Sequence, residues 1–155
     1  MPDSTSLKLR DARRDEVTLI VRMLADDHLG GGRETVSEPL PQGYYDAFDW
    51  IASDPNNRLL VAERDGVVIG TLQLTFLRGL SKVGAWIMLI EAVRVAGELR
   101  GRGIGRQMIA AAVDIARAHG CRSVELGTHQ SRVDAQRFYE QLGFVKSHFG
   151  MKLAL

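Results

Sequence analysis

The sequence predicts an α/β protein of the α+β type, with one central sheet flanked by helices. Runs with an apolar period of 3.6 residues alternate with short runs typical of strands. Asp65-Gly66, between two strand-like runs, predicts a tight hairpin because both turn positions favour positive φ. The resulting order is β-α-α-β-β-β-α-β-α-β-β. The 155 residues are enough for one domain with a full core, and no linker or repeat interrupts them, so we expect a single domain over 1–155.

The first half of the chain is predicted to contain two helices and four strands. Val17, Ile20, Val21 and Leu24 recur at helical spacing, and the glycine run 30–32 ends that helix and opens a loop. The expected elements are a strand at Leu7–Arg10, helices at Arg13–His28 and Tyr44–Ser53, and strands at Arg58–Glu63, Val67–Leu77 and Gly84–Val95.

The second half contains the strongest helical pattern. Ile104, Met108 and Ala112 belong to one apolar stripe, and Gly120 stands where a helix is expected to stop. The expected elements are helices at Gly103–His119 and Asp134–Leu142, a strand at Arg122–Leu126, and short closing strands at Phe144–Val145 and Met151–Leu153.

Composition excludes several functional classes. Hydrophobic residues make up 45% and charged residues 25%, as in a globular domain, and the net charge of +1 argues against a nucleic-acid partner or an acidic membrane surface. No apolar run is long enough to span a membrane, and the polar start is unlike a signal peptide, so we expect a cytoplasmic protein. The single cysteine, Cys121, excludes an intrachain disulfide, and no cluster has metal-ligand spacing, so we expect no metal.

The segment Arg100-Gly101-Arg102-Gly103-Ile104-Gly105-Arg106 joins a predicted strand to the strongest predicted helix. Glycines allow the backbone to approach a ligand, and the first turn of a helix offers N–H groups and partial positive charge. The three arginines add full charges, so the segment predicts a site for a phosphate or diphosphate. A dinucleotide fingerprint is disfavoured because Met108 stands where its last glycine belongs, and no Walker A sequence occurs. The alternative is a turn that only connects strand and helix.

These residues resemble the GCN5-related N-acetyltransferase (GNAT) superfamily. The acetyl-CoA motif of that family, Gln/Arg-x-x-Gly-x-Gly/Ala, is matched in full by residues 100–105. A second family segment is matched by Arg132-x-x-Ala135-x-x-Phe138-Tyr139-x-x-x-Gly143-Phe144, except that Arg132 stands in place of asparagine. The resemblance implies the GNAT fold, a mostly antiparallel sheet splayed in the middle, and acetyl-CoA as acyl donor.

The resemblance also implies where the donor binds. The strand before the glycine turn splays from its neighbour, and the pantetheine arm pairs with backbone groups near Val93–Val95, where an N–H polarises the thioester carbonyl. Arg132 is left with three alternatives: the cofactor phosphates, a substrate carboxylate, or Asp134. The expected coenzyme A contacts are Val93, Arg94, Val95, Arg100, Gly101, Arg102, Gly103, Ile104, Gly105, Arg106, Arg132 and Phe138.

Two residues are predicted to be catalytic. Tyr139 matches the tyrosine that the family uses to protonate the departing thiolate, and its alternative role is that of a core aromatic. Glu91, among apolar neighbours in a predicted strand, is the candidate base, since desolvation raises a carboxyl pKa; its alternative is a salt bridge to Arg94 or Lys82.

The acceptor is expected to be a small-molecule or peptide amine, and a homodimer is a possible assembly. The leading hypothesis is an N-acetyltransferase that works by direct attack in a ternary complex, and the alternative is a non-catalytic acyl-CoA-binding domain of the same fold. The candidate acceptor-binding residues are Arg33, Glu34, Tyr44 and His129. The alternative is a solvated loop for Arg33 and Glu34, a core position for Tyr44 and a polar surface group for His129.

Overall fold

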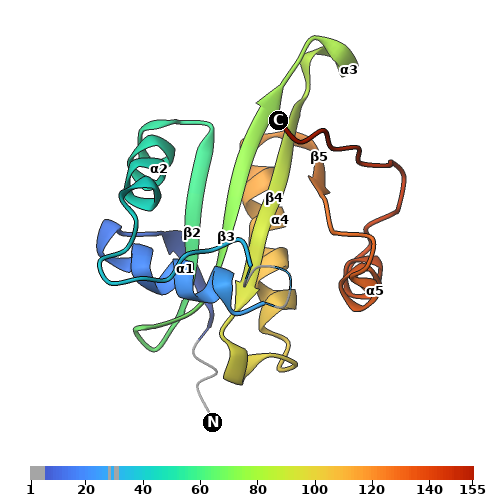
Figure 1. Ribbon diagram of the computed structural model, residues 1–155. Coiled ribbons are helices and arrows are strands. Elements are labelled where there is room, and N and C mark those ends of the chain that lie inside the picture. Colours follow the sequence, from blue (N-terminus) through green and yellow to red (C-terminus); the bar gives the residue numbers. More distant parts are fainter. Residues whose placement is uncertain (1–5, 28, 30–31) are drawn as a thin grey trace. The chain divides into compact units, whose positions relative to one another are not determined.

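The computed structural model describes residues 6–27, 29 and 32–155. They form a mixed α/β fold with a five-stranded sheet flanked by helices (Figure 1), as the sequence predicts. The strands are β1 (Lys8–Asp11), β2 (Asn57–Arg64), β3 (Val67–Arg78), β4 (Trp86–Val95) and β5 (Cys121–Leu126). The helices are α1 (Val17–Ala25), α2 (Gln42–Ser53), α3 (Ser81–Gly84), α4 (Ile104–His119) and α5 (Val133–Gln141), with 3₁₀ turns at Arg14–Glu16 and Gly97–Leu99.

The chain divides into two compact units, Met1–Glu125 and Leu126–Leu155. The first contains the sheet and helices α1 to α4, and the second contains α5 and the chain end. A single domain over the whole chain stays a prediction.

The sheet follows the order of the sequence, β1-β2-β3-β4-β5, and its first four strands pair antiparallel. The β2–β3 hairpin turns at Asp65-Gly66, both with positive φ as the sequence predicts. Strands β2, β3 and β4 are consecutive antiparallel neighbours, and the glycine turn follows directly after the end of β4 at one end of the sheet.

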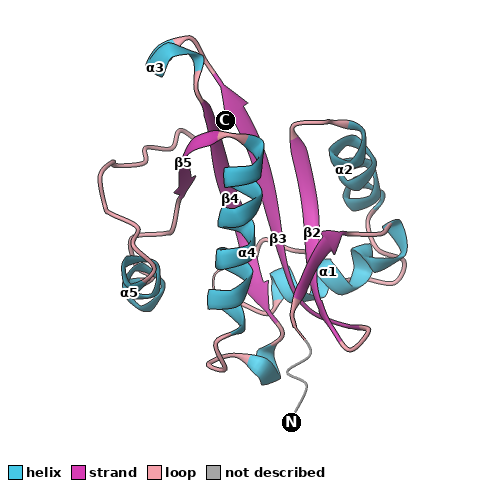
Figure 2. Cartoon of the chain, turned by 180° about the vertical axis from the view of Figure 1, so that it is seen from behind, coloured by secondary structure: helices cyan, strands magenta, loops and turns pink. Residues whose placement is uncertain are grey.

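Helices cover both faces of this sheet. Helix α4 lies on one face (Figure 2), where Phe76 of β3 stacks on His119 at 4.0 Å. Helices α1 and α2 lie on the other face, where Val61 of β2 packs against Ile20 and Met23. The buried core is therefore two apolar layers divided by the sheet, and α4 contributes Ile104, Met108, Ile109, Ala112 and Ala116 to it.

A β-bulge interrupts the pairing of β3 with β4. Thr71 lies opposite Arg94 and Gln73 opposite Glu91, so Leu72 alone spans two residues of β4. One of those two, Ala92, has a φ of 53°, in the left-handed region that side chains rarely occupy. The bulge reorients the last third of β4 relative to the rest of that strand.

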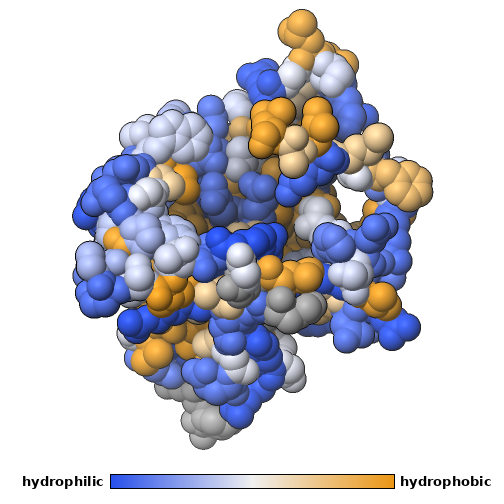
Figure 3. All heavy atoms as spheres, viewed as in Figure 1, coloured by the Kyte–Doolittle hydropathy of each residue, from blue (hydrophilic) through white to orange (hydrophobic). Residues whose placement is uncertain are grey.

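The sequence predicted a loop at Arg78–Lys82, and the structure has the four-residue α3 at the tip of the β3–β4 hairpin, in which Lys82 and Val83 adopt left-handed φ values of 55° and 58°. Hydrophobic side chains gather at this tip (Figure 3), where Leu80 and Val83 are fully exposed. The predicted helix end at His28 and the glycines at 30–31 lie outside the described residues.

The two predicted closing strands are absent from the second unit, whose residues are all described. Residues 144–155 form no strand, and within the two predicted strands Val145, Met151 and Leu153 are exposed, as are Phe149 and Leu155 outside them. Alternating apolar residues favour a strand only when a neighbouring strand and an apolar surface cover them, and the unit provides neither here.

An ion-pair network anchors the start of the chain to the sheet. Arg10 of β1 donates hydrogen bonds to Glu16 at 2.6 Å and to Glu63 of β2 at 2.8 Å. The Glu16 carboxylate is buried and also accepts the backbone N–H of Arg13 at 2.8 Å. The Arg10 hydrogen bond is the main cause that lowers the pKa of Glu16, and desolvation opposes it.

We predict that Glu16→Gln lowers the free energy of unfolding by about 2 kcal/mol at pH 7, because it removes the charge that Arg10 binds. A lowered carboxyl pKa stabilises the fold above the ordinary glutamate range, and this stabilisation is lost as the pH falls through the lowered pKa. Urea unfolding at pH 7 and pH 3 should show the difference between the two proteins shrinking in acid. The exposed Glu98→Gln serves as control, and equal losses for both variants would contradict the assignment.

Candidate active site

The glycine turn before α4 has the geometry of an anion site. Gly101 and Gly103 adopt left-handed φ values of 75° and 77°, and a Cβ on either would meet no atom within 4 Å. The first helical hydrogen bond is donated by Gln107 to Gly103, so the N–H groups of Ile104, Gly105 and Arg106 precede the helical pattern. The turn therefore presents backbone donors to an open space at the positive end of α4.

The structure divides the motif residues into two groups. Ile104 is 2% exposed and anchors the helix in the core, so only its backbone faces the open side. Arg102 and Arg106 are exposed beside the turn. These two side chains are free to move toward an anion. The sequence predicted this role for all three arginines of the motif.

Arg100 is already engaged within the protein. Its guanidinium donates to the backbone oxygen of Asp26 at 2.6 Å, to the Asp26 carboxylate at 3.0 Å, and to the Val95 oxygen at 3.3 Å. A Cβ on Gly97 would lie 2.8 Å from the Asp26 carboxylate, so a larger residue there would make this side chain shift. Arg100 thus ties the glycine turn to the end of α1.

Arg94 makes a second connection to the same end of α1. It forms a salt bridge with Asp27 at 3.1 Å and donates to the backbone oxygen of Val93 at 2.9 Å. The side chains are only 17% and 7% exposed, in contrast to 49% and 62% for Arg100 and Asp26. Val93 and Val95, the expected pantetheine contacts, flank Arg94 and are half-buried.

Glu91 precedes the bulge and shares a face with Gln73, because directly opposite residues of an antiparallel pair project to the same side. That face carries α1 and α2. Its side chain is exposed, whereas the sequence suggested burial among apolar neighbours. The bulge explains the difference, since pairing becomes irregular beyond Glu91 and leaves β4 uncovered at that point.

The loop before α2 brings a carboxylate to the same face. Tyr44 of α2 donates its hydroxyl hydrogen to Glu34 at 3.0 Å and accepts the backbone N–H of Thr35 at 2.9 Å. Glu34 is half-buried by this contact, whereas Arg33 is exposed. Two of the four predicted acceptor residues, Glu34 and Tyr44, are therefore joined.

The second unit carries the remaining candidates. Tyr139 of α5 is half-buried, with its ring edge-on to Phe138 at 5.1 Å and to Phe144 at 5.7 Å. Arg132 precedes the helix as its N-cap residue. His129 accepts the backbone N–H of Ser131 at 3.2 Å, a contact within its own loop.

Sequence reasoning missed Asp26 and Asp27. Two carboxylates directly after a helix interact unfavourably with the helix dipole, so nearby cations are expected to stabilise them. The sequence therefore contains a signal for both residues. The partners are 67 and 74 residues away in the chain, and only the fold reveals which arginines they are.

Other chemistries receive no support in the described ranges. Burial raises the pKa of the Cys121 thiol, which disfavours a thiolate nucleophile. Among residues 6–27, 29 and 32–155, no three histidine, cysteine or carboxylate side chains gather as a metal site would require. No helix in those ranges is long and apolar enough to cross a membrane.

The model of the acetyltransferase (GNAT) family matches residues 20–144. The chain is similar to an aminoalkylphosphonate N-acetyltransferase of Salmonella typhimurium, 37% identical over 114 residues that cover 74% of this chain and 73% of that protein.

Solved structures agree with the fold. A transcriptional regulator from Bacillus halodurans C-125 is 43% identical with a TM-score of 0.92, over 96% of this chain and 99% of that chain. An aminoglycoside N-acetyltransferase in complex with CoA is 18% identical with a TM-score of 0.77, over 100% of this chain and 98% of that chain. At that identity the second likeness shows the fold alone.

We predict unequal effects for the two adjacent aspartates. Asp27→Asn should lower the free energy of unfolding by about 3 kcal/mol, because it removes the charge opposite a largely buried arginine. Asp26→Asn should cost less than about 1 kcal/mol, because that pair is exposed. Urea unfolding at pH 7 compares the two variants, and an Asp26 variant as unstable as the Asp27 variant would refute this ranking.

Proposed function

Because the chain belongs to the acetyltransferase (GNAT) family, whose model matches residues 20–144, we propose that it transfers an acetyl group from acetyl-CoA to a primary amine. The family and the named N-acetyltransferase relative establish an acyltransferase. The donor, the acceptor and the residues in each role are our proposal.

One observation carries the proposal: the turn Gly101–Gly103 presents backbone donors to open space at the start of α4. Coenzyme A has a diphosphate, which fits such a set of donors at a positive helix end. Arg102 and Arg106 are in place to add charge, while Arg94 and Arg100 hold the turn. The CoA complex of the aminoglycoside N-acetyltransferase supports the same donor on this fold.

The reaction follows from the acyl chemistry. The amine nitrogen attacks the thioester carbonyl, a C–N bond forms, and the C–S bond breaks to release coenzyme A as a thiolate. The amine loses a proton to Glu91, directly or through water, and the thiolate receives one from the Tyr139 hydroxyl. A backbone N–H near Val93 stabilises the oxyanion in between. No metal and no covalent enzyme intermediate is required, so attack takes place in a ternary complex.

The acceptor is a small molecule in this proposal. The Salmonella relative is named for aminoalkylphosphonates, which supports a compact amine as the class. We propose a cytoplasmic protein without nucleic-acid partners, in keeping with a net charge of +1. The exposed apolar side chains of residues 145–155 are compatible with a homodimer that covers them.

The relative described as a transcriptional regulator favours a second candidate, an acyl-CoA-binding domain without turnover. Coenzyme A release over a panel of amines separates the two. Tight acetyl-CoA binding with no release for any amine would favour the second candidate.

We predict that Gly103→Ala weakens acetyl-CoA binding at least about tenfold, because a Cβ enters the space where the diphosphate lies. Gly66→Ala is the matched control, since Gly66 has a similar φ of 76° and open space in a hairpin turn. Both variants should lose similar stability, and calorimetric titration should find normal affinity only in the control. Equal affinity in both would remove the glycine turn from the donor site.

A pH–rate experiment tests the two catalytic roles together. We predict that Tyr139→Phe lowers kcat by about 10²-fold with little change in acetyl-CoA affinity, because it removes the proton donor. Glu91→Gln should remove the acidic limb of the kcat profile, because the base is gone.

Tyr45→Phe is the control for the loss of a hydroxyl, since the Tyr45 ring lies under the Arg14 guanidinium at 4.8 Å and has no role in the proposed mechanism. An unchanged kcat in Tyr139→Phe, or a wild-type pH profile in Glu91→Gln, would exclude that residue from the mechanism.

A further inference from the structure

A cavity of about 180 Å³ opens between α1, α2 and the sheet. It lies on the face that Glu91 and Gln73 share, and Ala92 of the bulge lines it. Because Val93 follows directly, this cavity adjoins the place where the proposed function puts the thioester. An acceptor seated in it reaches the reacting carbonyl, and the inference below rests on that function.

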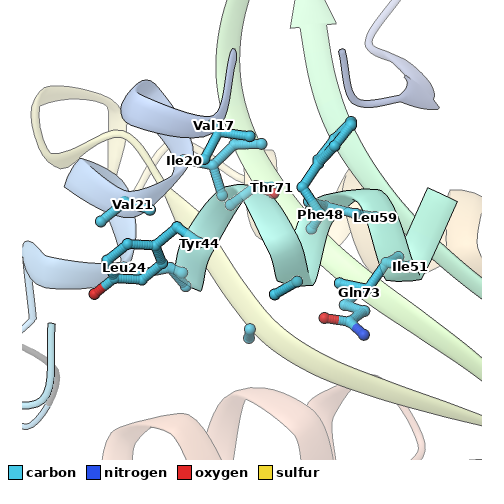
Figure 4. Close-up of a pocket in the computed structure, with 12 residues that line it drawn as sticks. Val17, Ile20, Val21, Leu24, Tyr44, Phe48, Ile51, Leu59, Thr71 and Gln73 are labelled. Carbon is cyan, nitrogen blue, oxygen red and sulfur yellow. The ribbon is translucent and has the colours of Figure 1, made fainter. Parts of the chain in front are cut away.

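The lining is almost wholly apolar. Helix α1 contributes Val17, Ile20, Val21 and Leu24, and α2 contributes Ala47, Phe48 and Ile51 beside the Tyr44 ring (Figure 4). Only Thr71 and Gln73 add polar side chains from the sheet, and Thr71 already donates its hydroxyl hydrogen to the Leu60 oxygen at 2.8 Å. The cavity therefore favours an apolar carbon skeleton over a ligand whose polar groups need hydrogen bonds.

The charges around the lining are those that a cationic amine prefers. The Tyr44 hydroxyl holds the Glu34 carboxylate, and Glu91 projects from the same face of β4. No charged side chain is among the described residues of the lining itself. The arginine that shares this face, Arg94, is bound to Asp27. An anionic substituent would thus enter an apolar lining near two carboxylates, and the lining itself provides no charged side chain to pair with it.

We propose that the acceptor is a primary amine with an apolar carbon skeleton and no phosphonate, phosphate or carboxylate group. This class differs from the aminoalkylphosphonates for which the Salmonella relative is named. The skeleton fills the cavity between α1 and α2, and Glu34 and Glu91 attract the ammonium form before it loses its proton.

The test measures coenzyme A release with straight-chain amines from propylamine to hexylamine and with aminoalkylphosphonates of equal carbon number. Burial of one methylene contributes roughly 0.8 kcal/mol, so kcat/KM should rise about fourfold per carbon until the cavity is full. Each phosphonate should be at least about tenfold poorer than its alkyl counterpart. Phosphonates that equal or exceed the alkylamines would overturn the proposal.

A substitution that fills part of the cavity provides a second test. Ala47→Leu adds bulk at a partly open position of the lining and should lower kcat/KM for hexylamine about tenfold or more, with less than about twofold effect on propylamine. Ala52→Leu changes the same helix outside this lining and should leave both amines unaffected. Equal losses for the two amines in Ala47→Leu would place the acceptor elsewhere.

Binding distinguishes failure of the inference from failure of the proposed function. If no amine is acetylated, the proposed function fails, and calorimetric titration with hexylamine and an aminoalkylphosphonate still tests the cavity. Tighter binding of hexylamine supports the inference, whereas tighter binding of the phosphonate, or no binding of either, overturns it.

Discussion

The bulge in β4 is the constraint on which the candidate site depends. Residues three apart in a regular strand project to opposite faces, so Glu91 and Arg94 would be separated by the sheet. One extra residue between them brings both side chains to the same face of the sheet. Their partners Gln73 and Thr71 are two residues apart and therefore share that face. The carboxylate of Glu91 and the arginine that binds the end of α1 therefore share one face because of a single backbone irregularity at Ala92.

The arginine cluster divides into two groups that the sequence does not distinguish. Arg94 and Arg100 bind Asp27 and Asp26 at the end of α1, and they fix the strand end and glycine turn against that helix. Arg102 and Arg106 stay exposed beside the turn. A turn held in place with exposed charges next to it suits a polyanionic ligand, because the backbone donors are positioned in advance and only long side chains must order.

Sequence periodicity predicted β1 to β5 and the long helices to within a few residues, because each has an amphipathic face that the core requires. The closing strands were wrong because alternation alone cannot supply a partner strand for residues 144–155. Part of the candidate site could be predicted from the sequence. The glycine spacing predicted the turn, but neither the bulge nor the aspartate–arginine pairs can be predicted from the local sequence. Both arise from pairing between distant segments, as with Gln73 and Glu91.

The left-handed conformation of Ala92 restricts how this chain can vary during evolution. Strand β4 favours branched residues such as the valines at 93 and 95, yet a β-branched side chain at position 92 would meet the steric cost of a φ of 53°. Glycine, asparagine and aspartate tolerate that conformation, and alanine is the small apolar compromise. Homologues that keep the bulge should thus show a narrow residue choice here, set by the backbone and independent of the amine each one acetylates.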